Sequence, residues 1–318
     1  MSHSKKVVVV TGASQGLGAG IVEGFRKLGY QVVATSRSIK PSSDPDILTV
    51  AGDIADPATA EKIIREGVAR FGRIDTLVNN AGIFLAKPFT AYTREDYVNT
   101  VATNMGSFFH MSQQAIAQME KQGEGGHVVS ITTTLVDHAI DGVPSVLASL
   151  TKGGMNAATK SLAIEYAKRG IRVNAVSPGI IKTPMHGEES HAALGNLHPV
   201  GHMGEVQDIV GAVLYLDSAN FVTGEILHVD GGQSAGHRWR RPVPVRGQPR
   251  NAPLAGTSRG IVLQVKAMDD LTAVIGIIVR LETQCLGQVA HRRIVGGIHR
   301  IHLPKTVSAG GLDQMLHQ

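Results

Sequence analysis

The most constraining feature of this sequence is an apolar run that leads directly into a cluster of glycines. Val7–Val10 are four consecutive β-branched residues, which favours a buried strand, and glycines follow at Gly12, Gly16 and Gly18. Apolar residues then recur at helical spacing as far as Leu28. Glycines permit positive φ angles, and a helix N-terminus presents free N–H groups to an anion. The segment predicts a phosphate-binding turn, although tight packing of a strand on a helix also accounts for a lone glycine cluster.

Strand-like and helix-like segments alternate over the first 237 residues. The predicted strands are Val7–Val10, Gln31–Thr35, Asp75–Val78, His127–Thr132, Arg172–Val176 and Glu225–Val229. The predicted helices are Gly18–Leu28, Pro57–Arg70 and Ser149–Ala167. This alternation predicts an α/β fold with a doubly wound parallel sheet.

The composition changes abruptly near residue 237. Every Phe and Tyr lies before residue 222, and residues 238–318 hold one aromatic side chain, Trp239. Those 81 residues contain 12 Lys/Arg and 4 Asp/Glu, whereas residues 1–237 contain 19 and 22. We therefore expect a single domain over residues 1–237, followed by a basic C-terminal extension, 238–318, that is partly disordered or loosely docked. A read-through or frame-shifted end would give the same change.

The basic extension raises the question of a nucleic-acid partner. Its charges are dispersed, and it lacks the aromatic side chains on which a single strand would stack, so nucleic-acid binding is disfavoured. No run of about 18 apolar residues occurs, the first residues are polar, and Cys285 is the single cysteine. We expect a cytoplasmic protein with no membrane partner.

Further motifs follow the glycine cluster in a fixed order. They are Gly52-Asp53-Ile54, Asn79-Asn80-Ala81-Gly82, Arg172–Gly179 and Thr223–Gly232. With these motifs the sequence resembles the short-chain dehydrogenase/reductase family over roughly residues 5–237. The resemblance implies a Rossmann-type fold, hydride transfer between a nicotinamide cofactor and a carbonyl or alcohol substrate, and a homodimer or homotetramer. It implies cofactor contacts at Gly12, Ser14, Gln15, Gly16, Leu17, Gly18, Ser36, Arg37, Asp53, Ile54, Asn80, Ala81, Gly82, Lys152, Pro178, Gly179, Ile181 and Thr183.

The choice between the two nicotinamide dinucleotides depends on the end of the second strand. An acidic residue there normally binds the ribose 2′-hydroxyl of NAD(H), but this chain has Ser36-Arg37. A guanidinium can pair with a 2′-phosphate, so NADP(H) is favoured and NAD(H) remains the alternative. Arg37 could also be an ordinary exposed side chain.

The family's catalytic tyrosine stands four residues before a lysine that binds the nicotinamide ribose. Here the lysine is Lys152, and the tyrosine position holds Ala148, which has no ionisable group. Ser149 points about 100° away from that position on a helix. Loss of a general acid typically slows a reaction by about 10²–10⁴-fold.

Several side chains are candidates for the remaining catalytic roles. A hydroxyl from Thr134, or next from Thr133, would polarise the substrate oxygen, and the resemblance gives Asn104 a role in orienting the active-site helix or a water. Lys152 could deliver the proton through a water or serve only as a ribose anchor. Weaker candidate acids in the nearby loop are Asp137, His138 and Asp141.

A segment rich in glycine and polar residues, Pro184–Gly204, is expected to cover the substrate. His198 and His202 lie four apart, but no acid or cysteine pattern accompanies them, so no metal site is predicted. We therefore predict an NAD(P)(H)-dependent oxidoreductase. The alternatives are a catalytically impaired dinucleotide-binding sensor or scaffold and, less favoured, a nucleic-acid-binding module.

Overall fold

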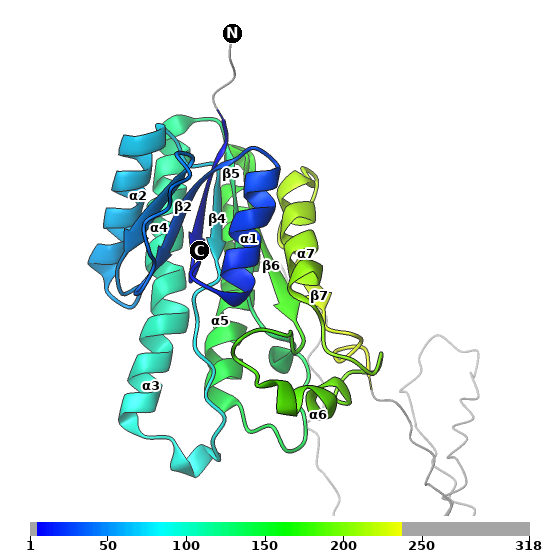
Figure 1. Ribbon diagram of the computed structural model, residues 1–318. Helices are drawn as coiled ribbons and strands as arrows, with labels where there is room; N and C mark the ends of the chain where they lie inside the picture. The colour runs from blue at the N-terminus through cyan, green and yellow to red at the C-terminus, as the bar shows by residue number, and fades with distance from the viewer. Residues whose placement is uncertain (1–4, 237–318) are drawn as a thin grey trace, which may run out of the picture. The chain divides into compact units, whose positions relative to one another are not determined.

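The computed structural model describes residues 5–236, which fold around a parallel sheet of seven strands (Figure 1). The strand order is β3-β2-β1-β4-β5-β6-β7. The strands are β1 Val7–Thr11, β2 Gln31–Ser36, β3 Ile47–Ala51, β4 Thr76–Asn79, β5 Gly126–Ile131, β6 Ile171–Pro178 and β7 Ile226–Val229. The predicted doubly wound α/β fold is confirmed. The order reverses between β1 and β4, and ligands of such sheets bind outside the carboxyl ends of the strands at this point.

Helices cover both faces of the sheet. The α-helices are α1 Gly16–Lys27, α2 Pro57–Phe71, α3 Arg94–Thr100, α4 Ser107–Gln122, α5 Val146–Tyr166, α6 His191–Gly195 and α7 Val206–Ser218. A π-helical turn, η2 Val101–Gly106, joins α3 to α4, and short 3₁₀ turns lie at η1 Phe89–Ala91, η3 Thr134–Val136, η4 Ala167–Arg169 and η5 Glu188–Ser190. In Figure 1, α1 and α7 lie together on one face, with α2 and α4 on the other.

The continuous apolar character of β1 follows from burial on both faces. Val7 and Val9 belong to one core, with side chains of α2, α4 and α5, whereas Val8 and Val10 belong to a second core with side chains of α1 and α7. All four valines are fully buried. A strand covered on both sides has no polar face to alternate with, so an unbroken valine run is stable there.

A buried polar cluster lies at the amino ends of the strands, away from the reversal point. The Asp217 carboxylate on α7 accepts hydrogen bonds from Tyr30 Oη and Thr76 Oγ1, both at 2.7 Å, and contacts His127 Nδ1 at 3.3 Å. These bonds hold the pKa of Asp217 down, at about 2, against the opposing effect of burial. The cluster ties α7 to two strands of the sheet.

The predicted elements occur with small shifts at their ends. The first helix begins two residues earlier than predicted, at Gly16, and Gly29 follows its end with φ of 83°. The long helix α5 begins at Val146 rather than Ser149. The prediction omitted β3, α3, α4, α6 and α7. The predicted extension over residues 238–318 lies outside the described residues.

Across residues 5–236, no helix has the length and apolar character needed to cross a membrane.

Candidate active site

The glycine turn between β1 and α1 is shaped to take a phosphate group. Gly12 and Gly16 have φ of 66° and 55°, a region that favours glycine. A Cβ on Gly18 would lie 2.2 Å from the carbonyl oxygen of Gly12, so that position admits no side chain. The N-cap, Gln15, makes no side-chain capping bond, which leaves the first N–H groups of α1 available to an anion. The residues present therefore fit a dinucleotide pyrophosphate.

The Asn79–Gly82 segment holds this turn in place. Thr11 Oγ1 accepts from the backbone N–H groups of Asn80 and Ala81 at 3.0 and 2.9 Å. In return, Asn80 Nδ2 donates to the carbonyl oxygens of Thr11 and Gly12 at 2.8 and 3.2 Å. Two motifs about 70 residues apart thus form one rigid unit at the point where the strand order reverses.

A cleft of about 800 Å³ runs along the carboxyl ends of the strands. Of the predicted cofactor-binding residues, every one lines this cleft: Gly12, Ser14, Gln15, Gly16, Leu17, Gly18, Ser36, Arg37, Asp53, Ile54, Asn80, Ala81, Gly82, Lys152, Pro178, Gly179, Ile181 and Thr183. Among the predicted catalytic residues, Lys152, Thr133 and Thr134 also line it, and Asn104 lies behind its wall.

The adenosine end of the cleft combines an exposed cation with hydroxyl groups that lack partners. Arg37 is exposed immediately after β2. Thr35 Oγ1 and Ser36 Oγ are buried, and neither has a hydrogen-bond partner. These groups lie where sequence analysis placed the ribose of the cofactor.

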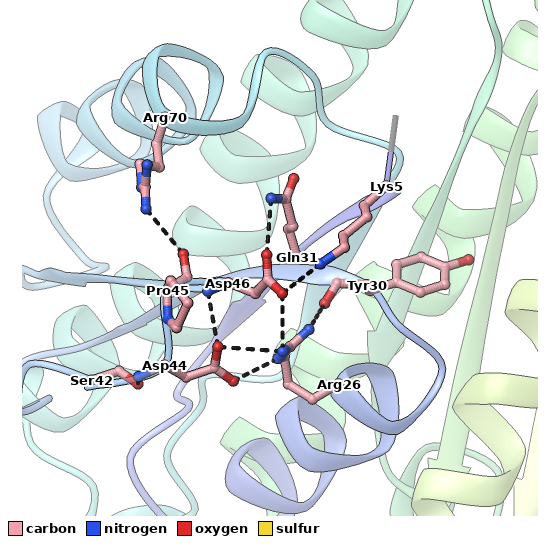
Figure 2. A network of polar contacts seen from close by, with 9 residues as sticks. All are labelled: Lys5, Arg26, Tyr30, Gln31, Ser42, Asp44, Pro45, Asp46 and Arg70. Atoms are coloured by element: carbon pink, nitrogen blue, oxygen red, sulfur yellow. Dashed lines mark hydrogen bonds and ion pairs between the residues drawn. The ribbon is translucent and has the colours of Figure 1, made fainter. Parts of the chain in front are cut away.

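A charged network fixes the loop that returns from Arg37 to β3 (Figure 2). Arg26 on α1 donates to Asp44 at 2.9 Å and to Asp46 at 3.2 Å, and Lys5 pairs with Asp46 at 2.7 Å. The hydrogen bonds to Asp44 and Asp46 lower the pKa of both carboxyl groups. The network anchors the far end of the loop whose near end presents Arg37 to the cleft.

Lys152 on α5 reaches across to the end of β5. Its Nζ donates to the carbonyl oxygen of Ile131 at 2.6 Å. Burial lowers its pKa to about 8. Ala148, one helical turn earlier, also lines the cleft. The ammonium group is therefore a stronger acid than that of an ordinary lysine, and it belongs to the residue one helical turn after Ala148, the position that the resemblance assigns to a tyrosine.

Asn104 is buried in the π-helical turn η2 and joins three elements. Its Oδ1 accepts from the N–H of Ile83 at 2.8 Å, and its Nδ2 donates to the Ile83 carbonyl and to Thr151 Oγ1 at 3.1 and 3.2 Å. Thr151 precedes Lys152 on α5. Asn104 thus positions the start of the loop after Gly82 against the helix that carries the lysine.

The structure distinguishes the two candidate hydroxyl groups. Thr134 is buried, and its hydroxyl donates to Asp230 Oδ2 at 2.9 Å. A hydroxyl has a single hydrogen, so Thr134 is committed to Asp230. Thr133 accepts only a long bond, 3.4 Å, from the N–H of Leu135 and keeps its own hydrogen available to the cleft.

Three weaker candidate acids do not line the main cleft. Asp137 is exposed and pairs with His228 at 2.9 Å. His138 and Asp141 line a separate cavity of about 290 Å³. Over residues 5–236 the structure shows no cluster of three or more His, Cys, Asp or Glu side chains suited to a metal ion.

The covering segment contacts the glycine turn. Pro184 Cδ, at the start of the segment, lies 3.8 Å from the position of a Cβ on Gly16. Lys182 and Glu205, which flank the segment, form an ion pair. His198 follows α6 in a turn, so it does not share a helical face with His202.

Sequence analysis missed the apolar wall of the cleft and several polar side chains. The wall is formed by Phe84, Leu135, Ile140, Val143, Met185 and Leu194. One of the polar side chains is Gln233, which follows the closing glycine pair and is 2% exposed. Its place directly after a motif of the resembling family was the signal that could have found it.

Comparison with known proteins identifies the family. A family model described as enoyl-(acyl carrier protein) reductase matches residues 12–234. An uncharacterized oxidoreductase of Methylorubrum extorquens is 36% identical over 71% of this chain and 97% of its own. The 3-oxoacyl-[acyl-carrier-protein] reductase FabG of Escherichia coli is 34% identical over 73% and 98%.

A solved structure agrees with these relatives. The protein ElxO with NADP bound is 31% identical, with a TM-score of 0.69 over 73% of this chain and all of its own. The chain belongs to the short-chain dehydrogenase/reductase family, and it is an NAD(P)-dependent oxidoreductase. The alternative of an impaired sensor finds no support among these relatives.

Proposed function

We propose that this protein reduces a carbonyl compound to an alcohol with NADPH, or runs the reverse reaction, with Lys152 in place of the usual tyrosine as proton donor. The observation that carries the proposal is that Lys152, Thr133 and the glycine turn between β1 and α1 line the same cleft. When bound, the cofactor supplies the hydride.

The preference for NADP(H) rests on the end of β2. Arg37 can pair with a 2′-phosphate, and the partnerless hydroxyls of Thr35 and Ser36 can donate to it. No carboxylate stands at these positions to repel the phosphate. ElxO, which has the same fold, binds NADP.

The proton follows from the chemistry of Lys152. The Nζ ammonium has three hydrogens, of which one is bound to the carbonyl oxygen of Ile131. As hydride adds to the carbonyl carbon, the C=O π pair moves to oxygen, and that oxygen takes a proton from the ammonium directly or through a water. The neutral amine is then reprotonated from solvent. A pKa of about 8 suits this exchange near neutral pH.

Thr133 is assigned the polarising hydrogen bond to the substrate oxygen. This reverses the order favoured by the sequence, because Asp230 takes the hydroxyl hydrogen of Thr134. The wall of Phe84, Val143 and Met185 indicates a substrate whose body is apolar around the reacting carbonyl.

A homodimer or homotetramer is proposed on the apolar side chains that α4 and α5 expose. Phe109 and Leu150 are 56% and 53% exposed. Light scattering of wild type against Phe109→Glu tests this assembly, which is refuted by a wild-type monomer.

The first experiment follows NADPH consumption against a broad panel of carbonyl compounds. We expect turnover that Lys152→Ala and Thr133→Ala reduce strongly, that Thr133→Ser retains, and that Thr134→Ser leaves nearly unchanged. NADPH binding, measured by its fluorescence, accompanies each variant. Tight binding without turnover on any carbonyl refutes the reductase and restores a sensing role.

A further inference from the structure

His198 makes two hydrogen bonds that require one neutral tautomer. It is 4% exposed, and its Nε2 accepts from the backbone N–H of Ile180 at 2.9 Å. On the other side of the ring, Nδ1 donates to the carbonyl oxygen of Leu194 in helix α6 at 3.1 Å. A backbone N–H can only donate and a carbonyl can only accept, so Nδ1 carries the hydrogen and Nε2 carries none.

The bond to Ile180 joins the covering segment, Pro184–Gly204, to the strand-end loop that lines the cofactor cleft, whereas the bond to Leu194 lies within the segment. Ile180 follows Pro178-Gly179, and Ile181 and Thr183 extend the same wall. Leu194, like His198, belongs to the covering segment, which we call the cover. Gly179 packs closely against the imidazole, because a Cβ there would stand 2.8 Å from His198 Nε2.

Protonation of Nε2 would break the bond to Ile180 and leave the bond from Nδ1 to Leu194. The new hydrogen on Nε2 would face the Ile180 N–H, and two donors repel each other. An unpaired acceptor lies near the same point: Gln233 Oε1 is buried without a partner and lies 3.0 Å from the position of a Cβ on Gly179. The amide orientation of Gln233 is fixed, since its Nε2 donates to the Leu197 carbonyl at 3.3 Å. An imidazolium would therefore turn away from Ile180 toward Gln233.

We propose that His198 is a positioning residue which, in its neutral form only, fastens the cover to the nicotinamide side of the cleft. Acidification releases the N–H of Ile180, whose carbonyl still accepts from the N–H of Gly204 at 3.1 Å, and weakens the hold on the cofactor. The assignment of the cleft to a nicotinamide cofactor rests on the proposed function, whereas the fastening itself does not.

The groups around His198 shift its pKa, some downward and some upward. Burial lowers the pKa of His198, and nearby His202 lowers it further, whereas the Asp230 carboxylate and the backbone bonds to Leu194 and Gly195 raise it. His138 and Asp141 lie across the smaller cavity. The net pKa is lowered, so the fastening is complete at pH 7 and is lost as pH falls below the usual range of histidine.

Two amide variants test the two bonds separately. His198→Gln places an amide oxygen near the Nε2 position, where it can accept from Ile180 at every pH. His198→Asn retains a donor for Leu194 but has no acceptor for Ile180. His202→Gln is the control, because His202 bonds the carbonyl of its neighbour Met203 and takes no part in the fastening.

The experiment measures the dissociation constant of NADPH by fluorescence between pH 5 and 8. For wild type and His202→Gln we expect the constant to rise by as much as tenfold per pH unit at the acid end. We expect a flat profile for His198→Gln and weak binding at every pH for His198→Asn. Equal acid slopes in wild type and His198→Gln overturn the proposal.

A second readout works without cofactor. Cleavage by a glutamate-specific protease at Glu188 or Glu189 in η5 reports opening of the cover. The ratio of wild-type to His198→Gln cleavage at each pH removes the protease's own pH dependence. We expect this ratio to rise on acidification, and a constant ratio overturns the fastening. Absence of NADPH binding at every pH would instead refute the proposed function.

Discussion

Restoring a tyrosine at position 148 tests the catalytic assignment most directly. Ala148 lines the cleft and lies one helical turn before Lys152 on α5. A phenol there would project beside the ammonium, whose charge favours the phenolate and so strengthens the phenol as an acid. General acids contribute about 10²–10⁴-fold, which corresponds to about 2.7–5.4 kcal/mol of activation free energy. Because Lys152 is proposed to supply part of this effect, we expect Ala148→Tyr to raise the rate toward the lower end of this range, about 10²-fold.

The assay is single-turnover oxidation of NADPH with a carbonyl that wild type reduces slowly. Ala148→Phe is the matched control, because it fills the same volume without a hydroxyl. We expect Ala148→Phe to reduce turnover by crowding the substrate. If the phenylalanine variant gains as much as the tyrosine variant, or if tyrosine gives no gain while NADPH binding is unchanged, the position plays no part in proton transfer.

Four further outcomes follow from the structure. Because the pKa of Lys152 is lowered to about 8, the rate of carbonyl reduction should fall as pH rises through about 8, and a pH–rate profile of Lys152→Met should lack this fall. Arg37→Ala should weaken NADPH binding by about 10- to 100-fold and leave NADH binding unchanged, as measured by fluorescence titration; equal loss for both cofactors contradicts contact with a 2′-phosphate. Gly18→Ala should abolish NADPH binding, because its Cβ would stand 2.2 Å from the Gly12 carbonyl oxygen; calorimetry that finds unchanged affinity contradicts the tight turn. Asp217→Ala should lower the free energy of unfolding, measured in urea, by about 3–5 kcal/mol, because the hydroxyls of Tyr30 and Thr76 lose their acceptor. A loss under about 1 kcal/mol contradicts that role.

The parts of the fold that the sequence predicted are those set by local pattern. The β1 valines, the glycine turn and the first helix lie within about 20 residues, so the pattern of each one supports the prediction of the next. Helix α4 could also have been predicted, because its buried residues recur at helical spacing: Phe108, Met111, Ala115 and Met119. Strand β3 gave a weaker signal, since only Val50 within it is fully buried.

The details of the site depend on contacts that no local pattern contains. Thr133 and Thr134 are chemically alike, and the distinction between them comes from Asp230, 96 residues away. The tautomer of His198 likewise follows from Ile180, 18 residues before it, once the cover has folded. Sequence spacing presented His198 and His202 as a pair, whereas the structure gives them separate partners. Residue type and order predicted the cleft, and tertiary contacts assigned the individual roles within it.

The bond between Thr134 and Asp230 has a consequence for how the protein is made. A chain emerging from the ribosome exposes the glycine turn, β4 and Lys152 well before residue 230, and a domain generally folds as a unit. Until Asp230 has been synthesised, the Thr134 hydroxyl has no carboxylate partner, and the bond from Ile180 to the covering segment forms only after His198 has been synthesised. The contact that holds the residues after β5 to the closing motif is therefore completed only when nearly all of the described chain has been synthesised. We expect a nascent chain stalled before residue 230 to lack this contact.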